Sequence, residues 1–528
     1  MPLRAIRRVF NVSQTKRTAQ SMLMLIAFAI FGKAFGFLRE ALIAARFGSG
    51  IETDTYFIAQ SANALFITII TSSLGTTTIP ILTRIDALEG KEGKINHASN
   101  LLSVTLVIAV LIATLAWIVA PLAMKVLAYG FEKEQFEFAV FMMRLGMPTI
   151  LFAALSGIFD GYLQSENRFL VPSIGVATQT FSYITFLIFF APSFGIKGLM
   201  VTSIIGMVAQ VMVLLIGMIP TGFRYRPIFN LKDKYIRQVF ALIPPILLSV
   251  AINDINSMID KAMASTLVEG SISALNYASK LNKLVDSVFV SSIITVLYPL
   301  LSKGAAENDI KEVKKTTIQG INLIMLITIP ATVGMLILAE PIVRIVYERG
   351  VFDSVATQMT VGALAFYVLS LVFSSTKGLI FRVFYSLHDT KTPVINGAIA
   401  VLINVVMNMI FIKPLAHMGL ALATSISSIT TTIILMVSLR KKIGVIGLRK
   451  SLACAVKSII SSLIMAITVL LIYNKTKILF GMSFLGKLAG LLLPISIGAV
   501  LYFFLLYLLK VDELTWAVRL FQKKLKRL

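Results

Sequence analysis

Apolar segments of about twenty residues recur along the whole chain, separated by short segments rich in charged residues. An α-helix rises about 1.5 Å per residue, so each segment is long enough to cross a hydrocarbon core of about 30 Å. The pattern therefore predicts roughly fourteen membrane-spanning helices. The predicted spans are residues 20–45, 56–82, 99–121, 138–162, 170–192, 198–219, 238–263, 272–301, 317–339, 357–386, 393–412, 418–439, 451–473 and 487–509.

Composition narrows the class to an all-α polytopic membrane protein with almost no soluble domain. Of the 528 residues, 57% are hydrophobic and 14% are charged, whereas about a quarter of the residues of a soluble protein are charged. The single cysteine, Cys454, excludes an internal disulfide. The sequence contains no catalytic constellation, phosphate-binding glycine loop or metal-ligand spacing that we recognise. We therefore expect a non-enzyme without metal or cofactor.

The net charge of +24 would suit nucleic acid in a soluble protein, but here the cations fall in short loops between apolar segments. Alternate loops, together with both terminal segments, hold most of these Lys and Arg residues. The positive-inside rule then predicts a multi-pass protein of the cell membrane with both termini cytoplasmic. We expect membrane lipids around it and no nucleic-acid partner.

A repeat with an offset of about 220 residues runs through the first twelve predicted spans. The segment around Pro80 resembles that around Pro299, and residues 161–168 resemble residues 384–391. Parallel repeats of this kind build a central transport cavity. The predicted organisation is a basic N-terminus (1–19), a six-helix lobe (20–219), a cytoplasmic linker (220–237), a second six-helix lobe (238–439), two further helices (451–509) and a basic tail (510–528).

Several cations lie deep in predicted spans, where a charge is costly and usually faces a wet cavity. Lys33 is roughly 18 Å into its span, and Lys280 and Lys283 share one helix face. Arg39 lies nearer a helix end, so snorkelling to the headgroups or pairing with Glu40 is the alternative. Together these residues predict a cavity for an anion such as a carboxylate or a phosphate.

Polar side chains in other spans suggest a second site. Asn404 and Asn408 lie four residues apart on one predicted span, Thr424 lies on the next, and Asp254 and Asp260 lie on the seventh. Carboxylate and amide oxygens brought together suit a hard cation. Hydrogen bonding between helices is the alternative, and membrane helices routinely use Asn and Thr for it.

Residues 36–40 read GFLRE, residues 46–50 RFGSG, residues 53–57 TDTYF, residues 347–353 YERGVFD and residues 384–393 FYSLHDTKTP. In this order they resemble signatures of the lipid II flippase (MurJ/MviN) family, part of the multidrug/oligosaccharidyl-lipid/polysaccharide exporter superfamily. The resemblance implies two six-helix lobes around a cationic cavity and a lipid-tail groove on the last two helices. It also implies export of an undecaprenyl-diphosphate-linked peptidoglycan precursor by alternating access.

The resemblance implies substrate-binding roles for Lys33, Arg39, Asp54, Lys280 and Lys283. Lys33 and Lys280 replace arginines that are usual in the family, so the charge is kept while the bidentate geometry toward phosphate is weakened. A flippase for another polyprenyl-diphosphate glycan is one alternative, and a cation-coupled drug exporter of the superfamily is another. The basic cavity disfavours the exporter. We expect a monomer whose energy comes from a sodium or proton gradient or from the membrane potential.

Overall fold

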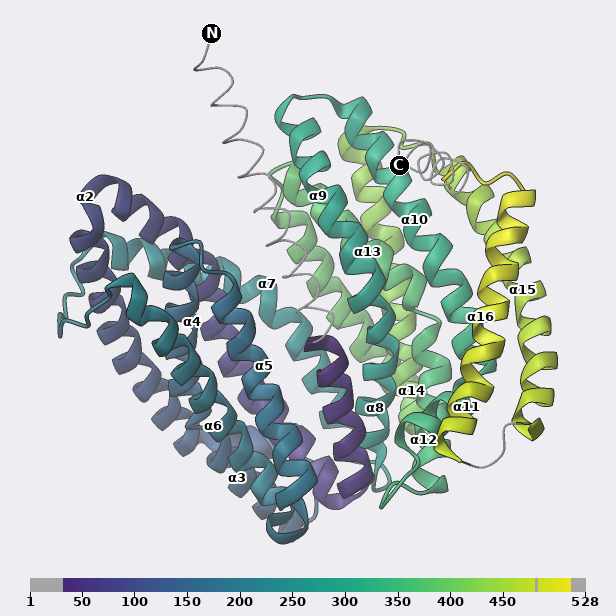
Figure 1. Ribbon diagram of the computed structural model, residues 1–528, viewed down its shortest axis with the longest axis horizontal. Coiled ribbons are helices and arrows are strands. Elements are labelled where there is room, and N and C mark those ends of the chain that lie inside the picture. Colours follow the sequence, from purple (N-terminus) through teal and green to yellow (C-terminus); the bar gives the residue numbers. More distant parts are fainter. Residues whose placement is uncertain (1–31, 480–482, 514–528) are drawn as a thin grey trace. The chain divides into compact units, whose positions relative to one another are not determined.

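The computed structural model describes residues 32–479 and 483–513, and helices account for nearly all of them (Figure 1). No strand occurs in these two stretches, which confirms the all-α class. The predicted basic N-terminus, the start of the first span and most of the basic tail lie outside the described residues. The chain divides into two compact units, the first comprising Met1–Phe47 and Thr55–Asp254, and the second Gly48–Asp54 and Ile255–Leu528.

The first unit begins with helical residues 32–47 and continues into α2 (Ile51–Leu127). We expected a loop between two predicted spans at residues 83–98. Helix α2 continues through this segment instead, because the segment is rich in good helix formers. It breaks at Gly90, where φ is 70°, a conformation that glycine adopts without strain. The other elements of this unit are α3 (Lys133–Gly146), α4 (Thr149–Ser165), α5 (Leu170–Thr185), the π-helical turn η1 (Phe186–Phe190), α6 (Ala191–Met218), the 3-10 turn η2 (Ile219–Thr221) and most of α7 (Lys234–Ala264).

The second unit contains the remaining helices, with an apolar core between α9, α10, α13 and α14 that includes Leu301, Val313, Ile324 and Leu435. One long helix, α14, holds two predicted spans and breaks at Ala416, where φ is 49°. The elements are α8 (Ser271–Val285), the π-helical turn η3 (Asp286–Val290), α9 (Ser291–Ala306), α10 (Ile310–Ile337), α11 (Ala339–Tyr347), α12 (Ser354–Val368), α13 (Leu371–Ser386), α14 (Lys391–Ile443), α15 (Leu448–Leu479) and α16 (Phe484–Leu508).

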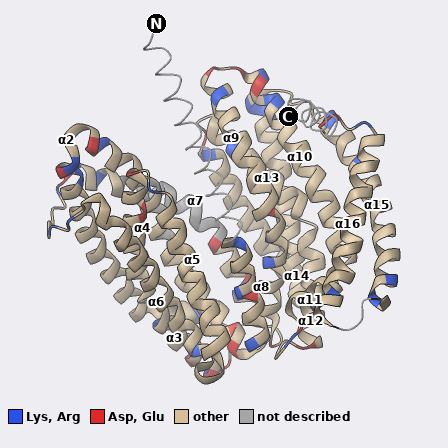
Figure 2. Ribbon diagram, in the orientation of Figure 1, with Lys and Arg blue, Asp and Glu red and all other residues tan. Residues whose placement is uncertain are grey.

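Many of these helices can cross a membrane. Within the described residues, eight helical stretches are long and apolar enough, or nine if α12 and α13, bent by 49°, form one span. Two of the eight, Leu170–Thr221 and Lys391–Ile443, each contain two predicted spans. Lys and Arg gather at helix ends, and α8 carries its two lysines, Lys280 and Lys283, toward its C-terminal end (Figure 2). The multi-span membrane architecture is confirmed, and the number fourteen stays a prediction.

The last two helices, α15 and α16, pack against each other and α15 against α10 (Figure 1). The hydroxyl of Tyr502 on α16 donates to the Leu326 carbonyl on α10 at 2.9 Å, and lies 2.6 Å from Ser458 Oγ on α15. A Cβ at Gly498 would lie 2.4 Å from the Val469 side chain, so α15 and α16 approach closely there. This pair is therefore integral to the second unit. The lipid-tail groove that the resemblance implies on it stays a prediction.

A buried lysine, Lys94, lies beside the Gly90 break in the first unit. Lys94 is wholly buried, with Nζ 2.5 Å from Glu166 Oε1 and 3.3 Å from Asp86 Oδ2. Its ammonium also lies 5.1 Å from the centroid of the Tyr162 ring. The predicted linker packs on the same helix, where Asn100 and Asn230 exchange two hydrogen bonds of 3.0 and 2.7 Å. Segments that we expected to be loops thus form a packed cap.

Candidate functional site

The first predicted cations lie on helical residues 32–47. Arg39 Nη2 lies 2.7 Å from Glu40 Oε1, and the guanidinium carbon lies 5.1 Å from the centroid of the Tyr183 ring on α5. Of the two alternatives for Arg39, the structure contains the pair with Glu40. Arg39 Nε is buried without a hydrogen-bond partner among the described residues. Lys33 is half-buried on the same helix. The carboxylate and the ring thus hold a guanidinium that retains unused donor capacity.

Asp54 lies in the first turn of α2, and its carboxylate caps α8. Oδ2 accepts a hydrogen bond from the Gly270 N–H at 2.8 Å, and Oδ1 accepts one from the Ser273 N–H at 2.7 Å and another from Ser273 Oγ. The first N–H groups of a helix lack partners within the helix, and the helix dipole favours an anion there. Asp54 is therefore a positioning residue for α8. A direct contact with substrate stays a prediction.

Residues of the sequence motifs surround this cap. The Tyr277 hydroxyl on α8 donates to the Gly48 carbonyl at 3.0 Å, and the Tyr347 hydroxyl donates to the Tyr277 carbonyl at 3.3 Å. The rings of Tyr277, Tyr347 and Phe352 cluster with centroids 4.9, 5.5 and 5.7 Å apart. Gly48 has a φ of 66°, and a Cβ there would lie 2.9 Å from the Val351 carbonyl oxygen. Several residues of the sequence motifs, among them Gly48, Tyr347 and Phe352, therefore pack around the first half of α8.

Lys280 and Lys283 lie toward the end of α8, just before the π-helical turn η3. Lys280 is half-buried and Lys283 is exposed. Lys283 interacts electrostatically with Asp260 of α7 and with Asp286 of η3. Lys377 of α13 also interacts with Asp286. Single π-helical turns inside helices are frequent at functional sites, so this end of α8 is the best candidate for an anion-binding face in the second unit.

Asp286 and Lys377 fall inside the predicted spans 272–301 and 357–386, but the sequence did not show that they lie near Lys283. The Ser375 hydroxyl of α13 donates a hydrogen bond to Asp286 Oδ1, which joins α13 to η3. The spacing of three residues between Lys283 and Asp286 was the one available signal. Lys33 and Arg39 belong to the first unit, whereas Lys280 and Lys283 belong to the second. A cavity shared by both sets stays a prediction.

The predicted polar cluster is assembled in the second unit. Asn408 Nδ2 donates to Asp260 Oδ1 at 2.7 Å and to Asn404 Oδ1 at 3.0 Å. Thr424 Oγ1 donates to Asp260 Oδ2 at 3.1 Å and accepts from Asn404 Nδ2 at 3.2 Å. Asp260, Asn404 and Asn408 are all buried. Asp254 belongs to the first unit, so its participation stays a prediction.

The donor set of this cluster fits a hard cation. Asn408 Oδ1 is buried and has no hydrogen-bond partner in the described part of the chain. It adds an amide oxygen to the carboxylate of Asp260 and the hydroxyl of Thr424, which are the ligand types that such cations take. Groups of three or more His, Cys, Asp or Glu suited to a metal ion are absent from residues 32–479 and 483–513. Hydrogen bonding between helices, the alternative reading, is also present.

Comparison with known sequences points to one family. The family model for lipid II flippase MurJ matches residues 43–490. A probable lipid II flippase MurJ of Rickettsia prowazekii (strain Madrid E) is 29% identical over 501 residues, which cover 92% of this chain and 97% of that protein. The lipid II flippase MurJ of Burkholderia cenocepacia is 26% identical over 436 residues, 80% of this chain and 84% of that protein.

Solved structures agree. The inward closed conformation of a lipid II flippase MurJ superposes with a TM-score of 0.75 at 25% identity, covering 93% of this chain and 99% of that one. An inward-facing multidrug resistance MATE family transporter of the MOP superfamily has a TM-score of 0.70 at 14% identity, with 79% and 95% covered. The second likeness concerns the fold alone.

Proposed function

The chain belongs to the lipid II flippase MurJ family, and we infer from this membership that it translocates lipid II across the cell membrane. It is a multi-span membrane transporter with a lipid substrate. We propose further that the substrate is the undecaprenyl-diphosphate-linked precursor and that it moves from the inner to the outer leaflet by alternating access. Both termini are then cytoplasmic, as the loop charges predict.

The cations of α8 carry this proposal. A lipid diphosphate is a compact anion, and lysine binds phosphate as a point charge while arginine offers a fork of donors. Lys280 and Lys283 lie on a helix whose start is fixed by Asp54, so their positions are set in advance of binding. The family resemblance implies the same role for Lys33 and Arg39 of the first unit. Preorganised cations lose little free energy in ordering when the headgroup arrives.

The polar cluster around Asp260 is the proposed coupling site. Asp260 interacts electrostatically with Lys283, so the charge state of the cluster and the charge offered to substrate are linked. With a sodium ion bound to the cluster, Asp260 attracts Lys283 less strongly, and Lys283 is more available to a diphosphate. A cation gradient can then bias the cycle, since any ligand shifts a conformational equilibrium by its differential affinity for the two states.

Rescue of cells depleted of their own lipid II flippase tests the anion-binding proposal. Lys280→Ala and Arg39→Ala each remove one charged contact, which should lower affinity for the headgroup about tenfold or more and cripple rescue. Lys280→Arg keeps the charge and should rescue. Lys457→Ala is the matched control, because this half-buried lysine of α15 lies outside the proposed site and donates to the Lys510 carbonyl at 3.5 Å. Export that survives alanine at Lys33, Arg39, Lys280 and Lys283 together would refute the proposal.

The coupling proposal has its own measurement, the thermal unfolding midpoint of the purified protein with sodium or with potassium. Sodium should raise the midpoint of the wild type, because a ligand that binds the folded state stabilises it by mass action. Asn408→Leu removes both an oxygen ligand and a hydrogen bond to Asp260, so this variant should lose the sodium effect. A wild type that ignores sodium would leave only hydrogen bonding between helices as the role of the cluster.

A further inference from the structure

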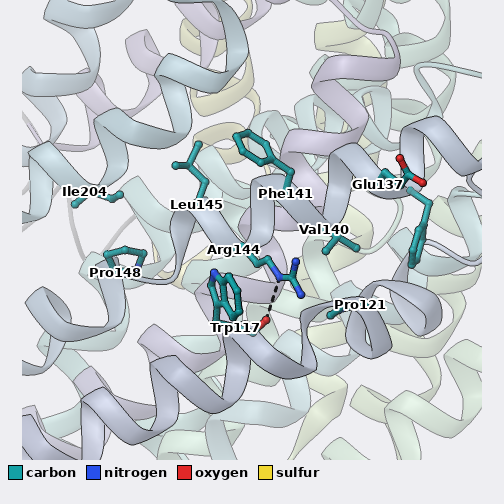
Figure 3. Close-up of a pocket in the computed structure, with 10 residues that line it drawn as sticks. Trp117, Pro121, Glu137, Val140, Phe141, Arg144, Leu145, Pro148 and Ile204 are labelled. Carbon is teal, nitrogen blue, oxygen red and sulfur yellow. Dashed lines mark hydrogen bonds between the residues drawn. The ribbon is translucent and has the colours of Figure 1, made fainter.

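A cleft on the first unit lies apart from every residue assigned above. It has a volume of about 720 Å³ and lies between the second half of α2, α3 and α6 (Figure 3). Its walls are mostly apolar and include Val140, Phe141 and Ile204. Two charged side chains, Arg144 and Glu137, also line it. An apolar cleft with one cation and one anion needs an occupant that is amphipathic.

Arg144 is held in place by a defect in α2. Pro121 has no N–H, so the Trp117 carbonyl four residues earlier lacks its usual helical partner. Arg144 Nε donates to this carbonyl at 3.1 Å, and its guanidinium carbon lies 4.4 Å from the centroid of the Trp117 ring (Figure 3). The bond to Trp117 uses Nε, and the two terminal nitrogens have no partner in the part of the chain that the structure describes. A rigid guanidinium with a free fork suits a phosphate.

Glu137 supplies the complementary charge. It precedes Arg144 by seven residues on α3, which is two helical turns or roughly 10 Å along the same face. Arginine side chains on helices lean toward the N-terminus, and here that direction leads toward Glu137. Glu137 is exposed, and no ion pair joins it to Arg144 in the described part of the chain (Figure 3). The Glu137 carboxylate and the Arg144 guanidinium can therefore bind a ligand whose anionic and cationic groups lie a few atoms apart.

The residue types around the cleft suit the headgroup level of a membrane. Trp is enriched at membrane interfaces, and Trp117 is 49% exposed. Lys125 and Lys133 mark the nearby ends of α2 and α3. Large apolar side chains of α2 beside the cleft, such as Leu115 and Leu122, are exposed as expected for contact with lipid chains.

We propose that this cleft binds a zwitterionic aminophospholipid, with its phosphate on Arg144, its ammonium on Glu137 and an acyl chain along the apolar wall. The charge pattern distinguishes this lipid from an anionic one, because phosphatidylglycerol offers the phosphate but no ammonium for Glu137. The lipid serves as a bound structural ligand of the first unit and is separate from the transported substrate.

Native mass spectrometry of the full-length protein tests the proposal. The protein is incubated in detergent with an equal mixture of phosphatidylethanolamine and phosphatidylglycerol that share the same acyl chains, and the retained lipids are counted. The wild type should retain phosphatidylethanolamine severalfold over phosphatidylglycerol. Glu137→Gln should abolish this preference while phosphatidylglycerol retention holds or rises. Arg144→Gln should weaken retention of both lipids about tenfold, because each loses its phosphate contact.

Lys125→Gln is the matched control, since it removes one exposed cation from the same end of α2 without touching the cleft. It should leave both the amount and the preference unchanged. Equal retention of the two lipids by the wild type would overturn the proposal, and so would an unchanged preference in Glu137→Gln. Loss of binding in Lys125→Gln as large as in Arg144→Gln would also overturn it, because general surface charge would then be the cause. Glu137 is exposed, so Glu137→Gln should fold even if Arg144→Gln does not.

Discussion

The ion pair between Lys94 and Glu166 joins residues that are distant in the chain. The Lys94 ammonium is withdrawn from solvent and lies between Glu166 and Asp86. A buried cation without its partners is costly, and the same holds for partly buried carboxylates that lose their cation. Glu166 and Asp86 keep 23% and 42% exposure, so water can partly replace the lysine. The pair therefore stabilises the first unit by a moderate amount.

Lys94→Met keeps most of the side-chain volume but removes the charge. We expect it to lower the free energy of unfolding by about 1–3 kcal/mol, the cost of leaving buried polar groups unpaired. The midpoint of thermal unfolding of the purified protein measures the effect. Glu92→Gln is the control, because the pair between Glu92 and Arg226 is exposed and such pairs contribute at most about 1 kcal/mol. Equal shifts for the two variants would contradict a structural role for Lys94.

Individual site residues differ in how far the sequence reveals them. Asn404 and Asn408 were predictable as a pair, because polar residues four apart in an apolar span share a face. Their junction with Asp260 followed from the few polar side chains at that depth. Lys94, by contrast, resembles an ordinary loop cation, and its partner Glu166 lies 72 residues away. Only the folded chain brings these two charges together.

At the scale of elements, the start of α8 determines where its lysines stand. Asp54→Ala should leave the Gly270 and Ser273 N–H groups without acceptors and cost about 1–2 kcal/mol, as for the loss of other helix caps. Rescue of flippase-depleted cells should fall further than this loss of stability explains, because α8 carries Lys280 and Lys283. Asp54→Asn keeps an acceptor oxygen, so it should retain most of the stability and much of the rescue.

Asp353→Ala is a matched control for this experiment. Asp353 caps α12, where its Oδ1 accepts a hydrogen bond from the Ala356 N–H at 2.8 Å. Its loss should cost a similar amount of stability but should leave rescue near the wild-type level. If both alanine variants rescue equally, α8 does not need its cap to position the lysines. If Asp54→Asn folds but fails to rescue, the negative charge of Asp54 itself is required.

The length of the apolar segments made the helices predictable from the sequence. The breaks within the helices were not predictable in this way. Each predicted span within the described residues overlaps a helix, because about twenty apolar residues have no other stable form in a membrane. The break between α3 and α4 at Met147 and Pro148 lies inside one predicted span. The turn η3 interrupts another. Such breaks arise from local backbone geometry and tertiary packing, which hydropathy does not report.

For the whole molecule, the orientation in the membrane is the prediction most open to test. Single cysteines are placed in a Cys454→Ser background and treated with a membrane-impermeant maleimide. Lys477→Cys, exposed at the end of α15, should react in intact cells. Val445→Cys, exposed between α14 and α15, should react only after permeabilisation. The opposite labelling pattern would show that the termini face outward.

The repeat made a two-lobe transporter predictable, but the connections between its parts were not. Residues 220–237 read as a free linker, yet Asn230 and Arg226 bind α2 within the first unit. The two compact units divide instead within α7, after Asp254. A linker that is polar and short resembles many others in sequence. Its hydrogen bonds to Asn100 and Asn96 depend on the fold of a helix more than a hundred residues earlier.

The cap on α8 also determines an order of events during biosynthesis, because its two halves are synthesised at different times. Asp54 leaves the ribosome 216 residues before Gly270, its hydrogen-bond partner. At roughly 5–20 residues per second, that interval lasts on the order of 10–40 s. Segment Gly48–Asp54 belongs to the second unit, so during this time the nascent chain holds a carboxylate whose acceptor sites only water or the translocation machinery can fill. Asp54 must therefore enter the membrane before the N–H groups that its carboxylate binds have been synthesised.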